Sequence, residues 1–211
     1  MTDNTKFLGV IIDKNLTFYD HIQYVKGKIA RSLGILYKAK KYLNKKSLLT
    51  LYNSFINPLF MYCIAIWGNA PITYLDSLFK LQKRAVRVIA SVKRTEHTWP
   101  IFKQLKILNL SNLYIYNVLL TMYKYHNRTI PEIFSTFFTS NRDIHWHYTR
   151  QQMHLHVPKK RSTLSTRSFR SSSVKIYNHF LAILPFDMTI LTFKYHVKTY
   201  LIENDVSHLV R

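Results

Sequence analysis

Apolar residues recur at the spacing of one helix face through two long stretches of this sequence, and lysines and arginines fill many of the positions between them. In the first stretch Asp20 stands at a position suited to an N-cap. Intervals of three, four and seven residues then predict an amphipathic helix. Its buried stripe would be Ile22, Val25, Ile29, Leu33, Leu36 and Leu43. Its other faces carry Lys26, Lys28, Arg31, Lys38, Lys40 and Lys41.

The second stretch predicts another amphipathic helix, with a cationic ridge on its outer side. Its buried side would be Leu75, Leu78, Phe79, Gln82, Ala85, Val86 and Ile89. Lys80, Arg84 and Arg87 align at helical spacing, with Lys83 beside them. Because no acidic residue occurs between Asp76 and Glu96, we expect these cations to lack an ion-pair partner nearby in the sequence. The ridge suits contact with a polyanion; the alternative is an ordinary solvated helix face.

Between these helices, the run from Leu48 to Trp67 is about as long as a membrane span. It contains polar residues and Pro58, and Lys45 and Lys46 precede it, so a buried helix capped by Asn44 is favoured over a span. Cys63, the single cysteine, cannot form an internal disulfide and is expected to be a reduced core residue. It favours an intracellular location, in the nucleus or cytoplasm, as does the lack of a secretory signal at the N-terminus.

The remaining segments predict a mainly α fold with a few short strands. Lys6–Asp13 is expected to form a buried strand with a close backbone approach at Gly9. Further helices are expected over 99–105, 111–126, 174–184 and 189–202, whereas 141–170 has the character of a loop with short strands. We expect three parts: a strand at 1–18, a helical domain at 19–138, and a basic module with two helices at 139–211.

Charge restricts the partner. Lysine and arginine number 31 against 10 acidic residues, a formal net charge of +21, while 47% of the 211 residues are hydrophobic. Such a chain can bury the core of one domain or two small ones and still present a large positive potential. Nucleic acid is the favoured partner because the charge is spread along the chain. The alternatives are an anionic membrane surface and an acidic protein.

The histidine-rich loop suggests two further chemistries. His145, His147, His154 and His156 form two His-x-His pairs that suit zinc in principle, but only Asp143 is placed to complete a site, so no metal is expected. Trp146 and Tyr148 are the best candidates for stacking on bases, because basic residues surround them. Neither a Gly-x-Ser-x-Gly nor a P-loop pattern is present, so no nucleophilic or phosphate-loop chemistry is expected.

Several segments, in order, resemble the C-terminal part of non-LTR (LINE-type, jockey-like) retrotransposon reverse transcriptases. FLGVIIDKNLTFYDHI (7–22) is similar to the end of their palm, and 35–70 and LDSLFKLQKRAVRVIA (75–90) look like their thumb. HTWPIFKQLKILNLSNLYIYNVLLTMYKYHNRTIPEIF (97–134) is similar to the region that follows. So are four segments of the tail: HWHYTR (145–150), VPKKRSTLSTRS (157–168), VKIYNHFLAILP (174–185) and FKYHVKTYL (193–201). The family usually has glycines in the basic tail loop and a tryptophan in the next helix, where this sequence has Leu164 or Ser165, Ser172 and Tyr177.

The resemblance implies a thumb-like helical bundle, followed by the small basic module, that binds a template and primer duplex without sequence preference. The family's catalytic aspartates hold two magnesium ions; no Asp-Asp pair occurs here, so we expect no polymerase activity from the chain by itself, and no cofactor, since magnesium would belong to the missing palm. The partners expected are RNA or DNA and, as a further partner, the rest of the reverse transcriptase.

The segment Phe7–Ile12 falls at the family's primer grip. We expect the grip not to form, because the partner strands would be missing; an ordinary core strand is the alternative. The expected nucleic-acid contacts are Lys80, Lys83, Arg84, Arg87, Lys26, Lys28, Arg31, Trp146, Tyr148, Arg150, Lys159, Lys160 and Arg161. Two rival interpretations are an inactive structural remnant of a truncated element and a basic protein anchored to membranes through Leu48–Trp67.

Overall fold

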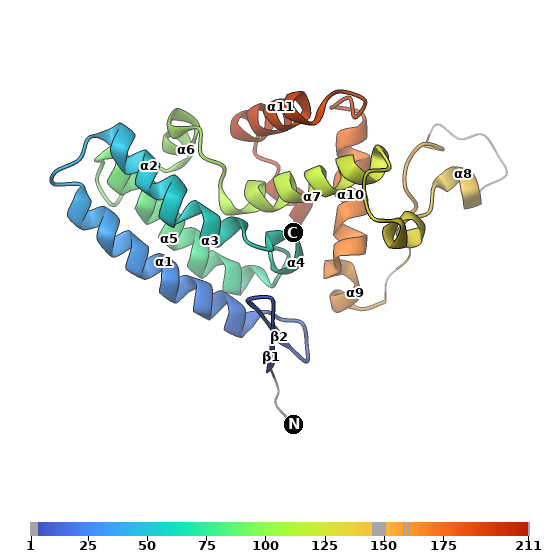
Figure 1. Cartoon of the computed structure of the whole chain (residues 1–211), viewed down its shortest axis with the longest axis horizontal. Helices are drawn as coiled ribbons and strands as arrows, with labels where there is room; N and C mark the ends of the chain where they lie inside the picture. Colours follow the sequence, from blue (N-terminus) through green and yellow to red (C-terminus); the bar gives the residue numbers. More distant parts are fainter. Residues whose placement is uncertain (1–3, 145–150, 158, 160, 211) are drawn as a thin grey trace. The chain divides into compact units, whose positions relative to one another are not determined.

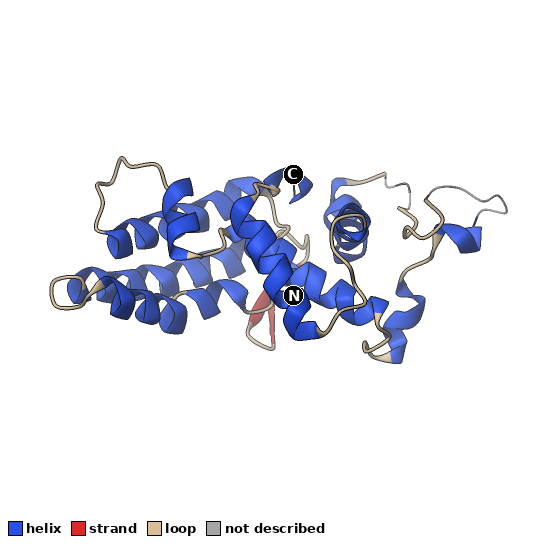
Figure 2. Cartoon of the chain, turned by 90° about the horizontal axis from the view of Figure 1, so that it is seen from above, coloured by secondary structure: helices blue, strands red, loops and turns tan. Residues whose placement is uncertain are grey.

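The computed structural model describes residues 4–144, 151–157, 159 and 161–210, and these fold mainly as helices (Figures 1 and 2). The predicted fold class, mainly α, is confirmed. The chain forms two compact units, Met1–Tyr114 and Ile115–Arg211, with the boundary inside helix α7 (Leu110–His126). The predicted division into 1–18, 19–138 and 139–211 stays a prediction, because compactness does not show which segments fold on their own.

The first unit contains a hairpin followed by helices. Its elements are β1 (Asn4–Phe7), β2 (Val10–Asp13), α1 (Tyr19–Ala39), α2 (Lys45–Phe55), α3 (Asn57–Met61), α4 (Ile64–Trp67), α5 (Ile72–Ala90), α6 (Trp99–Leu105) and the first residues of α7. The chain reverses after α1 and again before α5, so α1 and α5 run in the same direction and pack against each other (Figure 1).

The hairpin replaces the single strand expected at the N-terminus. β1 and β2 pair antiparallel, with Phe7 opposite Val10. The two residues between the strands, Leu8 and Gly9, have φ of 43° and 83°, as a two-residue hairpin turn requires. The prediction of one buried strand over Lys6–Asp13 is therefore wrong, because its glycine makes a turn and β1 is exposed. The expectation of missing partner strands is also wrong, because β1 directly precedes β2 and pairs with it.

The tip of this hairpin is fastened by a residue distant in the sequence. The Tyr62 hydroxyl, between α3 and α4, donates a hydrogen bond to the carbonyl oxygen of Leu8. A Cβ added at Gly9 would stand 3.4 Å from Cε1 of the same tyrosine. The glycine thus serves both the positive φ and the close approach of the Tyr62 ring.

Helix α1 buries the predicted stripe but begins differently from the prediction. Phe18, with φ 56°, precedes the helix and provides no side-chain cap, so the prediction of Asp20 as N-cap is wrong. Asp20 instead lies in the first turn, where its Oδ2 accepts a hydrogen bond of 2.5 Å from Asn4 Nδ2. The buried residues Ile22, Val25, Ile29, Leu33 and Leu36 are as predicted. Leu43 lies beyond the end of the helix and is exposed.

The apolar run expected as one helix is broken into α2, α3 and α4. Asn44 does cap α2, its Oδ1 accepting a hydrogen bond of 2.9 Å from the Ser47 N–H. Pro58 lies in the first turn of α3, and Cys63 adopts φ 51° between α3 and α4. Cys63 is partly exposed at this turn, so its prediction as a core helix residue is wrong. Among the described residues, no helix is long and apolar enough to cross a membrane.

Helix α5 buries most of the predicted side, including one amide. The prediction is wrong for Phe79, which is only half-buried, and it missed Leu81 and Val88, which are buried. Leu75, Leu78, Ala85, Val86 and Ile89 are buried together with Gln82. Gln82 Nε2 donates to the Tyr52 hydroxyl at 3.1 Å and to the Leu108 carbonyl at 3.0 Å. These bonds join α2, α5 and the segment before α7, and burial raises the pKa of the Tyr52 hydroxyl. One polar side chain therefore links three parts of the core.

The second unit comprises the rest of α7 followed by short and long helices. They are η1 (Glu132–Phe137), α8 (Asn141–Ile144), α9 (Thr163–Arg167), α10 (Phe169–Leu181), α11 (Ile190–Glu203) and η2 (Ser207–Val210). The short strands predicted for this region are replaced, in its described part, by short helices and one bridge between Ser140 and Leu155. The rings of Tyr123 and Phe193 lie 4.6 Å apart between centroids in the core of this unit.

Tyr177 stands where the resembling family usually has tryptophan. It is buried on α10, and its hydroxyl lies 2.7 Å from His126 Nδ1 on α7. Burial raises the pKa of Tyr177 to about 12, with the charge of Asp187 adding to the effect. The substitution therefore leaves this part of the tail packed, with a hydrogen bond to a neighbouring helix.

Candidate nucleic-acid interface

The outer side of α5 carries the four cations predicted there. Lys80 and Arg84 are exposed and Lys83 and Arg87 half-buried, opposite the seam that contains Leu78, Ala85 and Ile89. Because the apolar side of this helix is buried, the cationic side is the one available for a partner. We call Lys80, Lys83, Arg84 and Arg87 the α5 ridge.

Three of the four ridge cations have intramolecular partners. Lys80 Nζ lies 2.7 Å from Asp76 Oδ2, one turn earlier, so the expectation that these cations lack a local ion-pair partner is wrong for Lys80. Lys83 Nζ stands 4.1 Å from the Phe79 ring centroid, and Arg87 Nε donates to the Glu96 carbonyl at 2.9 Å. These contacts order the side chains. The exposed pair is worth only about 0.3–0.5 kcal/mol, so a phosphate can replace Asp76 at small cost.

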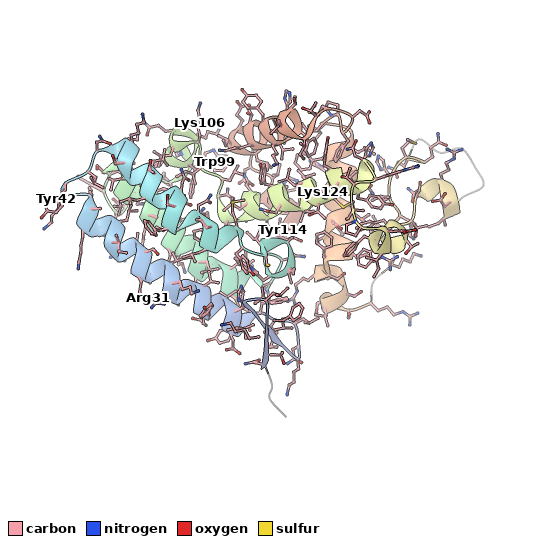
Figure 3. The ribbon with its side chains drawn as sticks, in the orientation of Figure 1. Arg31, Tyr42, Trp99, Lys106, Tyr114 and Lys124 are labelled. Atoms are coloured by element: carbon pink, nitrogen blue, oxygen red, sulfur yellow. The ribbon has the colours of Figure 1, made fainter. Side chains whose placement is uncertain are left out.

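The cations predicted on α1 lie on the neighbouring helix. Lys28 Nζ stands 4.4 Å and Lys6 Nζ 5.6 Å from the centroid of the Tyr24 ring. A hydrogen bond with Lys28 lowers the pKa of the Tyr24 hydroxyl, and the charges of Lys28, Lys6 and Arg31 lower it further. Lys26 is half-buried, and Arg31 projects from α1 into solvent (Figure 3). Lys6, Lys28 and Arg31 thus gather positive charge around Tyr24 on this surface.

The basic tail loop is described only in part. Trp146, Tyr148, Arg150 and Lys160 lie outside the described residues, as do His145 and His147. Lys159 and Arg161 are described and exposed, in the second unit. His154 and His156 are half-buried, and within the described ranges no group of three or more His, Cys, Asp or Glu side chains is placed to hold a metal ion. The stacking role of the loop stays a prediction.

Asp13, at the end of β2, has a structural role. Its carboxylate accepts hydrogen bonds from the backbone N–H groups of Thr17 at 3.0 Å and Phe18 at 2.6 Å. Desolvation acts to raise the pKa of Asp13, but these hydrogen bonds outweigh it and lower the pKa. Asp13 thus organises the loop that leads into α1.

One cationic segment was not among the predicted contacts. The segment from the last turn of α1 to the first turn of α2 carries five lysines and an exposed tyrosine, Tyr42, which lies among them (Figure 3). The lysines are Lys38, Lys40, Lys41, Lys45 and Lys46. The sequence signal was five lysines within nine residues. We assigned Lys38, Lys40 and Lys41 to a helix face and considered Lys45 and Lys46 only as charges before the apolar run. Tyrosine at helical spacing usually packs in a core. For this reason we did not predict Tyr42 as an exposed contact residue.

The fold and its cationic helices define a basic, mainly helical chain, and similarity to known proteins specifies the class. The chain is similar to RNA-directed DNA polymerases of Drosophila transposable elements. It is 34% identical over 90 residues to the probable polymerase from transposon BS of Drosophila melanogaster, and 26% over 106 residues to that from its X-element. It is 27% identical over 130 residues to the polymerase from mobile element jockey of Drosophila funebris. The resemblance to jockey-like non-LTR retrotransposon reverse transcriptases is thus confirmed.

These matches are partial on both sides. They cover 40%, 48% and 60% of this chain but 10%, 12% and 14% of the respective relatives. No family model matches the chain, and no solved structure matches it significantly. The similarity therefore concerns a short part of each polymerase.

Proposed function

We propose that the chain is a part of a retrotransposon RNA-directed DNA polymerase that clamps the template and primer duplex, and that it does not polymerise by itself. The observation that carries this proposal is the α5 ridge: four cations at helical spacing on the free side of a helix whose other side is buried. Similarity to retrotransposon polymerases supports nucleic acid as the polyanion.

The clamp would act through phosphates rather than bases. Lysine and arginine side chains on a helix follow the backbone of a duplex, and such contacts carry no sequence information. The ridge and the α1 cations Lys26, Lys28 and Arg31 would share this task from neighbouring helices. The chain has no Asp-Asp pair, and we assign it no cofactor, since the magnesium ions of polymerisation would be held by another part of such an enzyme.

The test is to replace the ridge residues Lys80, Lys83, Arg84 and Arg87 with glutamine and measure duplex affinity between 50 and 200 mM salt. Glutamine has nearly the same helix propensity, so the fold should persist. The slope of log affinity against log salt should shrink by about 0.9 for each phosphate that the variant no longer neutralises.

A charge-matched control replaces four exposed lysines of the second unit, Lys124, Lys175, Lys194 and Lys198, with glutamine. The ridge variant should lose clearly more affinity than this control. An equal loss would mean that the chain is a diffuse polycation and the ridge has no special role. An unchanged slope in the ridge variant would reject the clamp.

A further inference from the structure

We propose that the loop between α1 and α2 is a second nucleic-acid site, specific for unpaired bases, in which Tyr42 stacks on a base and the flanking lysines contact phosphates. We call residues 38–46 the α1–α2 loop. This inference rests on the proposed function only in that the α5 ridge and the α1–α2 loop would both bind nucleic acid. The two sites lie on different elements and would bind different forms of it.

The stability of the fold does not explain Tyr42. Its side chain is 85% exposed, the most exposed large hydrophobic residue among those described. No ring contact involves it among the described residues, and it projects from the end of the α1–α2 loop (Figure 3). A tyrosine in a core or against a helix would instead bury most of its ring.

The fold explains the position of three of the five lysines of the loop but not of the other two. Lys38 lies in the last turn of α1 and Lys40 and Lys41 directly beyond it, where positive charge complements the helix dipole. Lys45 and Lys46, by contrast, lie in the first turn of α2, where positive charge opposes the dipole and no acidic residue offsets it. No aspartate or glutamate occurs between Asp20 and Asp76. An external anion is therefore the natural counter-charge for this loop.

The loop is held in a fixed conformation. The backbone N–H of Tyr42 donates to the Ala39 carbonyl at 3.0 Å, and that of Leu43 donates to the same oxygen at 2.9 Å. Asn44 caps α2 through its side chain. The tyrosine is thus presented on an ordered turn between two helices, so little conformational entropy of the backbone is lost when a ligand binds.

The combination of an exposed ring and clustered cations favours a single strand. An aromatic side chain gains free energy by stacking on a base that has no stacked neighbour, and every base offers such a face. In a duplex the bases already stack on one another, so the ring would gain little there. A membrane surface fits less well. At the turn itself only Tyr42 and Leu43 offer apolar area, and the nearby exposed residues Ile35 and Tyr37 of α1 add two side chains, whereas a peripheral helix needs a broad apolar face.

The experiment measures affinity of the full chain for an oligothymidine strand and for a duplex of mixed sequence. Tyr42→Ala should weaken single-strand binding about 5-fold to 100-fold, the range expected for loss of stacking on one base, and change duplex binding less than about 2-fold. Tyr42→Trp should retain or strengthen single-strand binding. Tyr195→Ala removes another exposed tyrosine, on α11, and should have no effect.

The outcomes separate this site from the clamp. Equal weakening on both probes, or none in Tyr42→Ala, would overturn the inference, as would Tyr42-dependent binding to phosphatidylserine vesicles without single-strand binding. If the α5 ridge variant leaves duplex binding intact while Tyr42→Ala loses the oligothymidine, the clamp fails and the loop site stands. The reverse pattern removes the loop site alone. Because Tyr42 is exposed, the thermal unfolding midpoint of Tyr42→Ala should match that of the parent protein. Tyr42→Trp keeps an aromatic ring at this position, so its retained single-strand binding would show independently that the ring is what binds.

Discussion

Helices α1 and α5 run in the same direction, pack against each other and carry similar numbers of cations, yet their surfaces differ. On α5 the cations rest on Asp76, Phe79 and the Glu96 carbonyl, and the buried side holds an amide with two hydrogen-bond partners. On α1 the outer side includes Gly27 and Gly34, around which no atom lies within 4 Å of an added Cβ. Charge count alone does not distinguish these surfaces; the difference lies in what the cations contact. Three cations of α5 contact an aspartate, a ring and a backbone carbonyl, whereas on α1 Lys28 contacts the exposed ring of Tyr24.

The largest effect on the free energy of unfolding should come from replacing glycine with alanine, with opposite results at two positions. At Gly68, which leads from α4 toward α5, an added Cβ would stand 2.5 Å from the Ile64 carbonyl oxygen and 2.6 Å from Tyr114 Cδ2. Gly68→Ala should therefore lower the free energy of unfolding by about 3 kcal/mol. Gly34→Ala, in open space within α1, should raise it by up to about 1 kcal/mol.

Urea unfolding of both glycine variants measures this contrast directly. Similar unfolding midpoints for the two variants would show that the chain before α5 accommodates an added methyl group as easily as the surface of α1 does. That result would remove the distinction between the two helices.

A smaller effect should follow from the buried amide of α5. Gln82→Leu leaves the Tyr52 hydroxyl and the Leu108 carbonyl without their shared donor, and should cost about 2 kcal/mol. The double variant with Tyr52→Phe removes one of the two orphaned groups, so it should be less destabilised than the sum of its single variants. Strict additivity in a double-mutant cycle would mean that the two side chains are not coupled.

The smallest effect should come from the buried histidine of α1. Desolvation lowers the pKa of His21, and the charge of Lys28 adds to this. The unfolded chain therefore binds a proton near pH 6.5 that the folded chain resists, so stability present above that pH is lost as the pH falls through the folded value. Urea midpoints at pH 7.5 and 5.0 should differ more for the parent than for His21→Gln. An identical pH dependence would show that His21 is not responsible.

The two amphipathic helices could be predicted because each has a charged side, which shows which of its residues are buried. The run from Leu48 to Trp67 has little such contrast, so periodicity did not reveal the breaks at Pro58 and Cys63. Positive φ at Cys63 is set by its surroundings, since cysteine has no preference for that conformation. The hairpin was missed for a related reason: Leu-Gly is a weak turn signal compared with Asn-Gly.

For the candidate site, the identity of the cations could be predicted but not their partners. Lys80 pairs with Asp76 because residues four apart face each other on a helix; our prediction considered only acids after Asp76. The contacts of Lys83 with Phe79 and of Arg87 with a carbonyl depend on side-chain conformations that the sequence does not specify. Tyr42 was missed because exposure depends on where the neighbouring helix ends.

The hydrogen bond between Tyr62 and the hairpin tip has a consequence for the order of assembly. A two-stranded hairpin is marginally stable in water, and the anchor of this one lies 54 residues later in the chain. Closing so long a loop costs entropy that packing of α1 against α3 must offset first. We therefore expect the tip of the hairpin, which Tyr62 fastens, to close only after that helical contact and to open before it, so the amides near Leu8 and Gly9 should exchange with solvent sooner than those of the helices that hold them.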